Sequence, residues 1–189
     1  MTTEQANDLL IAAYQAEVQN RHREYIDDEV TKANIKSVAK CLTADNPKFG
    51  IMLCGTCGNG KTTLLLAFQN ALNYLSDARY FDTERKGIRI IDAKDVANLM
   101  KGDNTRAIRE TDMLGIEDMG REATDVMDYG NVYSPMIDLL EYRYNNQLFT
   151  FITTNLTGKE VRAKYGDRIA DRFNEMLEVV IFKNSTYRK

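Results

Sequence analysis

The segment IMLCGTCGNGKTT spans residues 51–63 and joins a short apolar stretch to a glycine-rich turn and the start of a helix. From Gly55 to Thr62 it fits the pattern G-x-x-x-x-G-K-[ST] without a mismatch. In that pattern the glycines let backbone N–H groups converge on a phosphate, and the amino end of the following helix adds partial positive charge. Lys61 supplies a point charge for the β- and γ-phosphates, and the Thr62 hydroxyl is a ligand for Mg²⁺. The segment predicts a phosphate-binding loop whose nucleotide contacts come from Gly55, Thr56, Cys57, Gly58, Asn59, Gly60, Lys61, Thr62 and Thr63.

Two other interpretations of the same segment are open. A glycine-rich turn can precede a helix by chance, but here an apolar strand and a helix both flank it, as the phosphate loop requires. Cys54 and Cys57 form a C-x-x-C pattern, which also occurs in redox and zinc sites. The chain has no second cysteine pair to complete a zinc site, so small residues packed near the phosphate are the favoured interpretation.

Apolar strands and helices alternate around this loop. Strands are predicted over residues 51–54, 88–91, 113–116, 148–153 and 179–182. Helices are predicted over residues 4–26, 64–75, 93–101, 135–146 and 166–176, with a further helix ending before the turn at Asn46-Pro47. This alternation predicts an α/β protein of the P-loop NTPase class, with a parallel sheet sandwiched by helices. We expect a helical N-terminal extension over residues 1–45 and the nucleotide-binding domain over residues 46–189.

Composition excludes several other classes of protein. The 189 residues are 43% hydrophobic and 28% charged, with a net charge of −3, which is typical of a globular domain and not of a strongly basic nucleic-acid binder. His22 is the only histidine, which excludes a two-histidine metal site and disfavours a Ser-His-Asp triad. No apolar run approaches the ~20 residues of a membrane span, and the first residues lack the features of a secretory signal. Together with three cysteines, an odd number, these features predict a cytoplasmic protein with reduced thiols.

Polar side chains follow two of the predicted strands. The strand MLGI ends in Glu117 and Asp118, and the strand FTFITT is followed by Asn155. A nucleotide hydrolase needs one carboxylate near Mg²⁺ and another to orient and deprotonate the attacking water. We assign Glu117 to Mg²⁺ and Asp118 to water, and Asn155 to a hydrogen bond that positions the water. A solvated strand end for the acidic pair and an ordinary turn at Asn155 are the alternatives.

The order of these motifs carries a family resemblance. Six motifs follow one another along the chain: GTCGNGKT, MLGIEDMG, SPMIDLLEYRYNNQ, FTFITTNL, YGDRIADRF and STYRK. The resemblance that they carry covers about residues 35–189. In this order the chain resembles the DnaC/DnaI helicase-loader group of AAA+ ATPases, which also includes the IstB transposition helpers. The resemblance implies that residues 55–62 are the Walker A loop, Glu117 and Asp118 the Walker B pair, and Asn155 the sensor-1 residue. It makes Arg172 an arginine finger, with Arg168 nearby, and Arg188 the sensor-2 arginine, without a full C-terminal lid domain.

The same resemblance implies partners and an assembly that depends on bound ATP. Its members bind ATP and Mg²⁺, assemble as homo-oligomers when ATP is bound, and act with a replicative helicase on single-stranded DNA. Because aromatic residues are scarce between residues 88 and 128, we expect weak, salt-dependent DNA binding through basic side chains: Arg85, Lys86, Lys94, Lys101, Arg106 and Arg109. Solvated helix faces are an equal alternative for these residues.

Two departures from the family pattern bear on activity. The acidic pair has Glu117 first and Asp118 second, and the shorter aspartate predicts slow, assembly- or DNA-dependent hydrolysis. Only about 40 residues precede the expected ATPase core, so the N-terminal helices are either a minimal docking arm or, as we prefer, ordinary packing.

Alternative functions remain open at this point. They are an ATP-sensing adaptor with negligible hydrolysis, an IstB-like transposition helper, and a P-loop kinase for a small molecule. For Arg168 and Arg172 the alternative to a finger is a pair with Asp167, Asp171 or Glu175 on the same helix.

Overall fold

The computed structural model describes residues 1–81, 86–102, 104–128, 131–184 and 186–187, and the chain forms two compact units. Unit 1 comprises Met1–Pro47, Gly55–Ile88 and Val180–Lys189, and unit 2 comprises Lys48–Cys54 and Arg89–Val179. The predicted boundary between residues 45 and 46 stays a prediction.

A five-stranded sheet has the order β2-β3-β6-β1-β7. The strands are β1 (Gly50–Gly55), β2 (Arg89–Asp92), β3 (Met113–Met119), β6 (Phe149–Thr154) and β7 (Glu178–Phe182), so all five predicted strands are confirmed with small shifts at their ends. The pairs β2–β3, β3–β6 and β6–β1 are parallel. Apolar residues of β3 and β6 are fully buried, because a parallel sheet is covered on both faces: Leu114, Ile116, Phe151 and Ile152.

The helices of unit 2 are short except for the last two. They are α4 (Val96–Leu99), preceded by the 3₁₀ turn Ala93–Asp95, α5 (Asn104–Arg109), α6 (Pro135–Asn145) and α7 (Gly158–Met176). The helix predicted over residues 93–101 is therefore wrong in its extent, and α7 begins eight residues before its predicted start at 166 (166 − 158 = 8). A capping box of Thr157 and Glu160 begins α7, and Gly166, with φ 84° and ψ 165°, breaks it in the middle.

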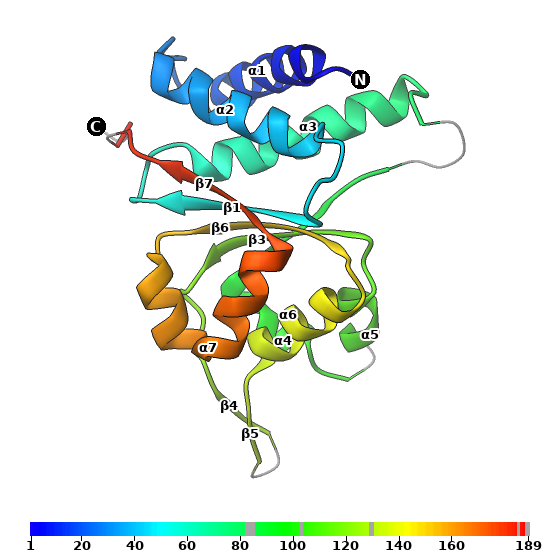
Figure 1. The fold of residues 1–189 in the computed structure, drawn as a ribbon, viewed down its shortest axis with the longest axis vertical. Helices are drawn as coiled ribbons and strands as arrows, with labels where there is room; N and C mark the ends of the chain where they lie inside the picture. Colours follow the sequence, from blue (N-terminus) through cyan, green and yellow to red (C-terminus); the bar gives the residue numbers. More distant parts are fainter. Residues whose placement is uncertain (82–85, 103, 129–130, 185, 188–189) are drawn as a thin grey trace. The chain divides into compact units, whose positions relative to one another are not determined.

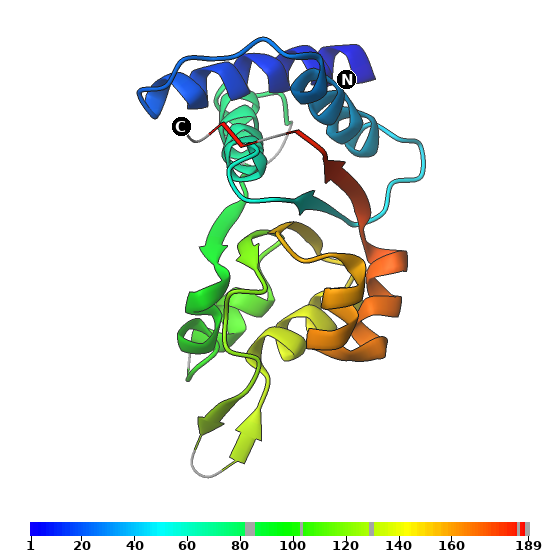
Figure 2. The ribbon, with the colours of Figure 1, turned by 90° about the vertical axis from the view of Figure 1, so that its left-hand side faces the viewer.

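A small hairpin of unit 2 was not predicted. Strands β4 (Val126–Asp128) and β5 (Asn131–Tyr133) pair antiparallel and extend away from the rest of the unit (Figures 1 and 2). Met127 and Val132 are paired in register and exposed.

Unit 1 is built on three helices, α1 (Thr3–Asn20), α2 (Glu29–Leu42) and α3 (Lys61–Asp77). Helix α1 lies against α2 and α3 (Figure 1) and buries Ala6, Leu10 and Tyr14, so packing accounts for its apolar side chains. The predicted helix over residues 4–26 is too long, because the chain leaves the helix at Arg21 and His22 has φ 54°. In the described part of the chain, no helix is long and apolar enough to cross a membrane.

Candidate nucleotide-binding site

The phosphate-loop sequence forms a turn that only glycine accommodates at its key points. Gly58 and Gly60 have φ of 81° and 97°, in the left-handed region that favours glycine. Gly60 is the N-cap of α3, and a Cβ built there would lie 2.3 Å from the Tyr14 hydroxyl oxygen. Glycine at position 60 is therefore required both by the backbone conformation and by the close approach of Tyr14.

Gly60→Ala is accordingly expected to lower the free energy of unfolding by about 1–3 kcal/mol. Urea denaturation measures this loss. The matched control is Gly158→Ala, because no other heavy atom lies within 4 Å of a Cβ at Gly158. The control should change the free energy of unfolding by less than about 0.5 kcal/mol, and equal losses in the two variants would contradict the assignment.

Lys61 is buried and points back into its own loop. Only 4% of the residue is exposed. Its Nζ donates hydrogen bonds to the carbonyl oxygens of Gly55 and Thr56, both at 2.7 Å, and to Asn59 Oδ1 at 3.1 Å. The turn therefore places the Lys61 ammonium group beside the amino end of α3, and both attract an anion. Phosphate oxygens are the ligand chemistry that would replace the loop carbonyls around Lys61.

The residues after β7 lie on this loop, which the sequence did not predict. The Tyr187 backbone N–H donates to the Gly58 carbonyl at 2.9 Å, and Asn184 Nδ2 donates to the Asn59 carbonyl at 2.9 Å. Asn59 Nδ2 in turn donates to the Phe182 carbonyl at 3.3 Å. These bonds fix the loop to a segment more than a hundred residues away in sequence (Asn184 and Asn59 are 125 apart).

The same segment also reaches the start of α2. The Tyr187 hydroxyl donates to Asp28 Oδ2 at 2.6 Å and lies 2.6 Å from Thr31 Oγ1. Partial burial of Asp28 acts to raise its pKa, but the hydrogen bonds from Tyr187 and Thr31 outweigh it and hold the pKa below its usual value. Burial raises the pKa of the Tyr14 hydroxyl, which keeps it neutral beside the phosphate loop.

In unit 2 the predicted carboxylates follow a shift in the strand pairing. The β3–β6 register shifts between Ile116 and Met119, so Glu117 and Asp118 lie at an irregular end of β3. Asp118 has φ 54° and its N–H donates to Thr153 Oγ1 at 2.9 Å. One of its carboxylate oxygens, Oδ2, is 2.6 Å from Arg121 Nη1.

The strand register brings the polar ends of neighbouring strands to one edge of the sheet. Asp92 of β2 is level with Glu117, and Thr154 of β6 is level with both Met119 and Cys54. The exposed Asn155 comes directly after Thr154, and the phosphate loop begins directly after Cys54. Carboxyl ends of parallel strands are where α/β sheets bind ligands.

The predicted finger arginines pair across helices and not along α7. Arg172 Nη1 and Arg168 Nε lie 2.7 Å and 3.2 Å from Glu141 Oε1 on α6. The Arg172 guanidinium also lies 5.0 Å from the centre of the Tyr144 ring. The alternative partners Asp167 and Asp171 pair with Arg162 instead. Arg188, the predicted sensor-2 residue, lies outside the described residues.

Other predicted residues have separate places in the fold. Arg106 pairs with Glu110, and Arg109 pairs with Asp138, both at the surface of unit 2. Arg85 lies outside the described residues.

The part of the chain that the structure describes holds no group of three or more His, Cys, Asp or Glu placed to bind a metal ion. Thr62, in the first turn of α3 in unit 1, is partly exposed, and so is Glu117 of β3 in unit 2. Hydroxyl and carboxylate oxygens are types of ligand that Mg²⁺ accepts.

Comparison with solved structures defines the fold. The structure of the DnaC helicase loader matches with a TM-score of 0.62 and 21% identity, over 85% of this chain and 94% of that one. The DnaI structure matches with a TM-score of 0.61 and 21% identity, over 87% and 88%. The chain has the fold of these two proteins. The replication initiator DnaA bound to AMPPCP and single-stranded DNA matches with a TM-score of 0.59 and 19% identity, over 85% of this chain and 49% of that one.

These matches confirm the predicted fold class, an α/β fold of the P-loop NTPase type with a mostly parallel sheet and flanking helices. No protein-family model and no curated protein sequence matches the chain.

Proposed function

We propose that this chain is an ATP-hydrolysing helicase loader of DNA replication, acting in the cytoplasm. The observation that carries the proposal is the set of side chains that this fold holds at loop and strand ends. A buried Lys61 lies in a glycine loop at the start of α3, Glu117 and Asp118 lie near the end of β3, and Asn155 follows β6. Phosphoryl transfer to water needs these groups and no further acceptor pocket.

In the proposed reaction, the loop N–H groups and Lys61 bind the phosphates of ATP. Asp118 accepts a proton from water as the water oxygen attacks the γ-phosphorus, and Asn155 orients that water. The bond from the γ-phosphorus to the bridging oxygen breaks, which leaves ADP and phosphate. Mg²⁺, held by Thr62 and Glu117, would supply charge neutralisation at the phosphates.

Arg172 is the proposed arginine finger for the nucleotide of a neighbouring subunit. Its side chain is 16% exposed and its charge is compensated by Glu141, so it must leave this carboxylate to reach a partner's phosphate. Arg168 is paired with the same carboxylate and is 72% exposed, so it can keep Glu141 neutralised when Arg172 leaves. Hydrolysis would then depend on assembly.

The proposed partners are a replicative helicase, single-stranded DNA and further copies of this chain. The fold match to DnaC and DnaI supports the helicase, and the match to DnaA bound to single-stranded DNA supports DNA. The basic side chains of α5 are DNA contacts in this proposal.

A second candidate is an ATP-sensing adaptor with negligible hydrolysis. The close Arg121–Asp118 ion pair favours it, because the Asp118 carboxylate is engaged by Arg121 and must leave it to contact an attacking water. In an adaptor, ATP-dependent capture of the partner survives Asp118→Asn. In a loader that needs turnover, release of the partner stops in the same variant.

Lys61→Ala tests the proposed function directly. It should weaken binding of a fluorescent ATP analogue by at least about tenfold, and abolish loading of a purified hexameric helicase onto circular single-stranded DNA. Lys32→Ala is the matched control, because Lys32 is a partly exposed lysine of the same unit that pairs with Asp27 and Glu29. Unchanged loading by Lys61→Ala would reject an ATP-dependent loader.

A further inference from the structure

The backbone around Asp118 is held by side chains as well as by strand pairing. After the register shift, Asp118 N–H donates to Thr153 Oγ1 at 2.9 Å and the Met119 carbonyl accepts from Thr154 Oγ1 at 2.6 Å. Met119 is the last residue of β3 and pairs with Thr154, so residues 120–122 lie beyond the strand. The position of this loop therefore depends on side chains that reach it from elsewhere in unit 2.

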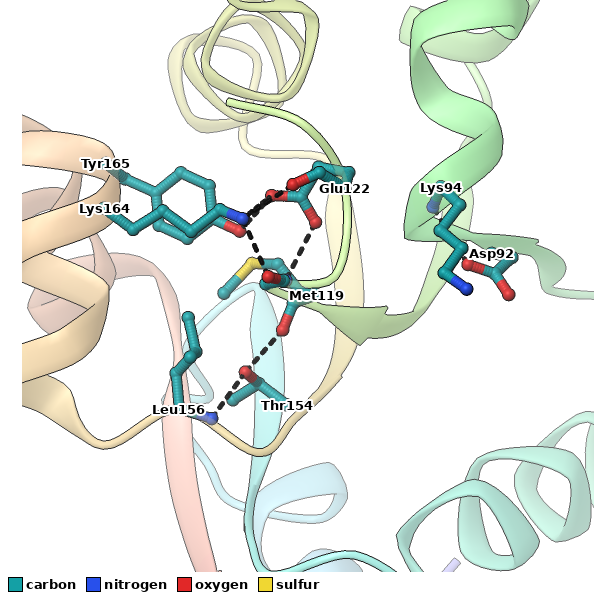
Figure 3. A network of polar contacts seen from close by, with 9 residues as sticks. Asp92, Lys94, Met119, Glu122, Thr154, Leu156, Lys164 and Tyr165 are labelled. Carbon is teal, nitrogen blue, oxygen red and sulfur yellow. Dashed lines mark hydrogen bonds and ion pairs between the residues drawn. The ribbon is translucent and has the colours of Figure 1, made fainter. Parts of the chain in front are cut away.

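Glu122 is the centre of that support (Figure 3). It is 7% exposed, an unusual degree of burial for a carboxylate. Oε2 accepts the Gly120 N–H at 2.8 Å, the Tyr165 hydroxyl donates to Oε1, and Lys164 Nζ lies 3.4 Å from Oε1. A buried charge with three such partners is compensated and fixed in one position.

Lys164 holds the other side of the same loop. Its Nζ donates to the carbonyls of Gly120 and Glu122, both at 2.7 Å. Both hydrogen-bonding groups of Gly120 are thus occupied, one by Glu122 and one by Lys164. Gly120 has φ 110°, and a Cβ there would lie 2.7 Å from Leu156 Cδ1, so the loop has little room to move.

We propose that Glu122 is a positioning residue for ATP hydrolysis, fixing the Asp118 carboxylate by clamping the loop Met119–Glu122 to Lys164 and Tyr165 of α7. The inference rests on the proposed function, because it needs Asp118 to act on water. Glu122 touches neither nucleotide nor water in this role. A displacement of about 1 Å at a reacting group lowers a rate by about 100-fold, so the clamp matters to turnover more than to binding.

The place of the clamp on α7 gives it a second consequence. Lys164 and Tyr165 directly precede the break at Gly166, and the half of α7 after the break carries Arg168 and Arg172. The first half of α7 therefore sets the position of Asp118, while the second half presents the proposed finger. A shift of α7 on assembly would reach the water-activating carboxylate through Glu122.

Tyr165→Phe is the sharpest variant, because it removes one hydroxyl and keeps the buried ring. The kcat for ATP should fall by about tenfold while the KM and the affinity for a fluorescent ATP analogue stay within about twofold. Glu122→Gln should lower kcat further, since it also removes the charge beside Lys164.

The matched control is Thr150→Val, which also removes a buried hydroxyl that is hydrogen-bonded, to Arg143 Nε at 2.9 Å. Thr150 lies at the opposite end of β6, so this variant should lose similar thermal stability and keep its kcat. Equal kcat in Tyr165→Phe and Thr150→Val would overturn the positioning role and leave only a structural one.

ATP turnover by the wild type distinguishes a failure of this inference from a failure of the proposed function. If wild-type turnover depends on Lys61 and Tyr165→Phe matches the wild type, only the role of Glu122 fails. If the wild type shows no Lys61-dependent turnover, the proposed hydrolysis fails, and the inference fails with it.

Discussion

Arg172→Ala is expected to lower assembled ATP turnover by about 10³-fold, because an arginine finger acting from a neighbouring subunit contributes about 10³–10⁵ in rate. The fold should survive this change, since Arg168 remains 3.2 Å from Glu141 and keeps its charge compensated. Binding of a fluorescent ATP analogue to the isolated subunit should also be unchanged, because the finger does not serve its own nucleotide. Steady-state phosphate release measures the turnover.

Mixing two inactive variants distinguishes a finger in trans from a structural arginine. A Lys61→Ala subunit still offers Arg172, and an Arg172→Ala subunit still has a working phosphate loop. Mixtures of the two should therefore recover part of the wild-type rate. Arg162→Ala is the control, because Arg162 is an exposed arginine of the same helix that pairs with Asp167 and Asp171. No recovery on mixing would contradict a trans finger.

Arg143→Leu should cause the largest loss of stability, about 3–5 kcal/mol in the free energy of unfolding. Arg143 is fully buried, and burial lowers its pKa to about 10, so it stays charged at neutral pH. Its guanidinium donates to the Thr150 hydroxyl and to the carbonyls of Arg109, Thr111, Asp112 and Phe149. Leucine fills the space and leaves these buried acceptors without their donor.

Urea denaturation compares this variant with Arg106→Leu. Arg106 is 83% exposed and pairs with Glu110 at the surface, so its loss should cost less than about 1 kcal/mol. A loss below about 1 kcal/mol for Arg143→Leu would show that water replaces the guanidinium inside unit 2.

The parts of the fold that sequence predicts are those with a strong local signal. Each of the five strands is a run of apolar residues between turn residues, and each was placed within a few residues of its observed bounds. The phosphate loop is predicted by the fixed spacing of its glycines and its lysine between a strand and a helix. The hairpin β4–β5 was missed because its strands have three residues each, too short for a period to be visible.

The start of α7 was missed for a different reason. Gly158 at its first position and Gly166 inside it both weaken a helical pattern, and the one local signal for its start is the capping box of Thr157 and Glu160. The capping box is therefore the sequence feature that predicts the first half of the helix.

The supporting residues of the site depend on contacts between distant parts of the sequence. Tyr187 meets Asp28 across 159 residues, and Tyr165 meets Glu122 across 43. Arg172 is similar, because the alternative partners considered for it lie on its own helix, whereas Glu141 of α6 is the residue that pairs with it. Such partners follow from helix packing, which local sequence patterns do not encode.

The central claim is that this chain hydrolyses ATP with the loop that contains Lys61. We would measure ATP turnover per subunit for the wild type and Lys61→Ala over a range of protein concentrations, with and without single-stranded DNA. The account predicts wild-type turnover that rises with concentration or DNA, and none in Lys61→Ala. Equal turnover in the two proteins, or ATP binding by the wild type without turnover under any of these conditions, would contradict it.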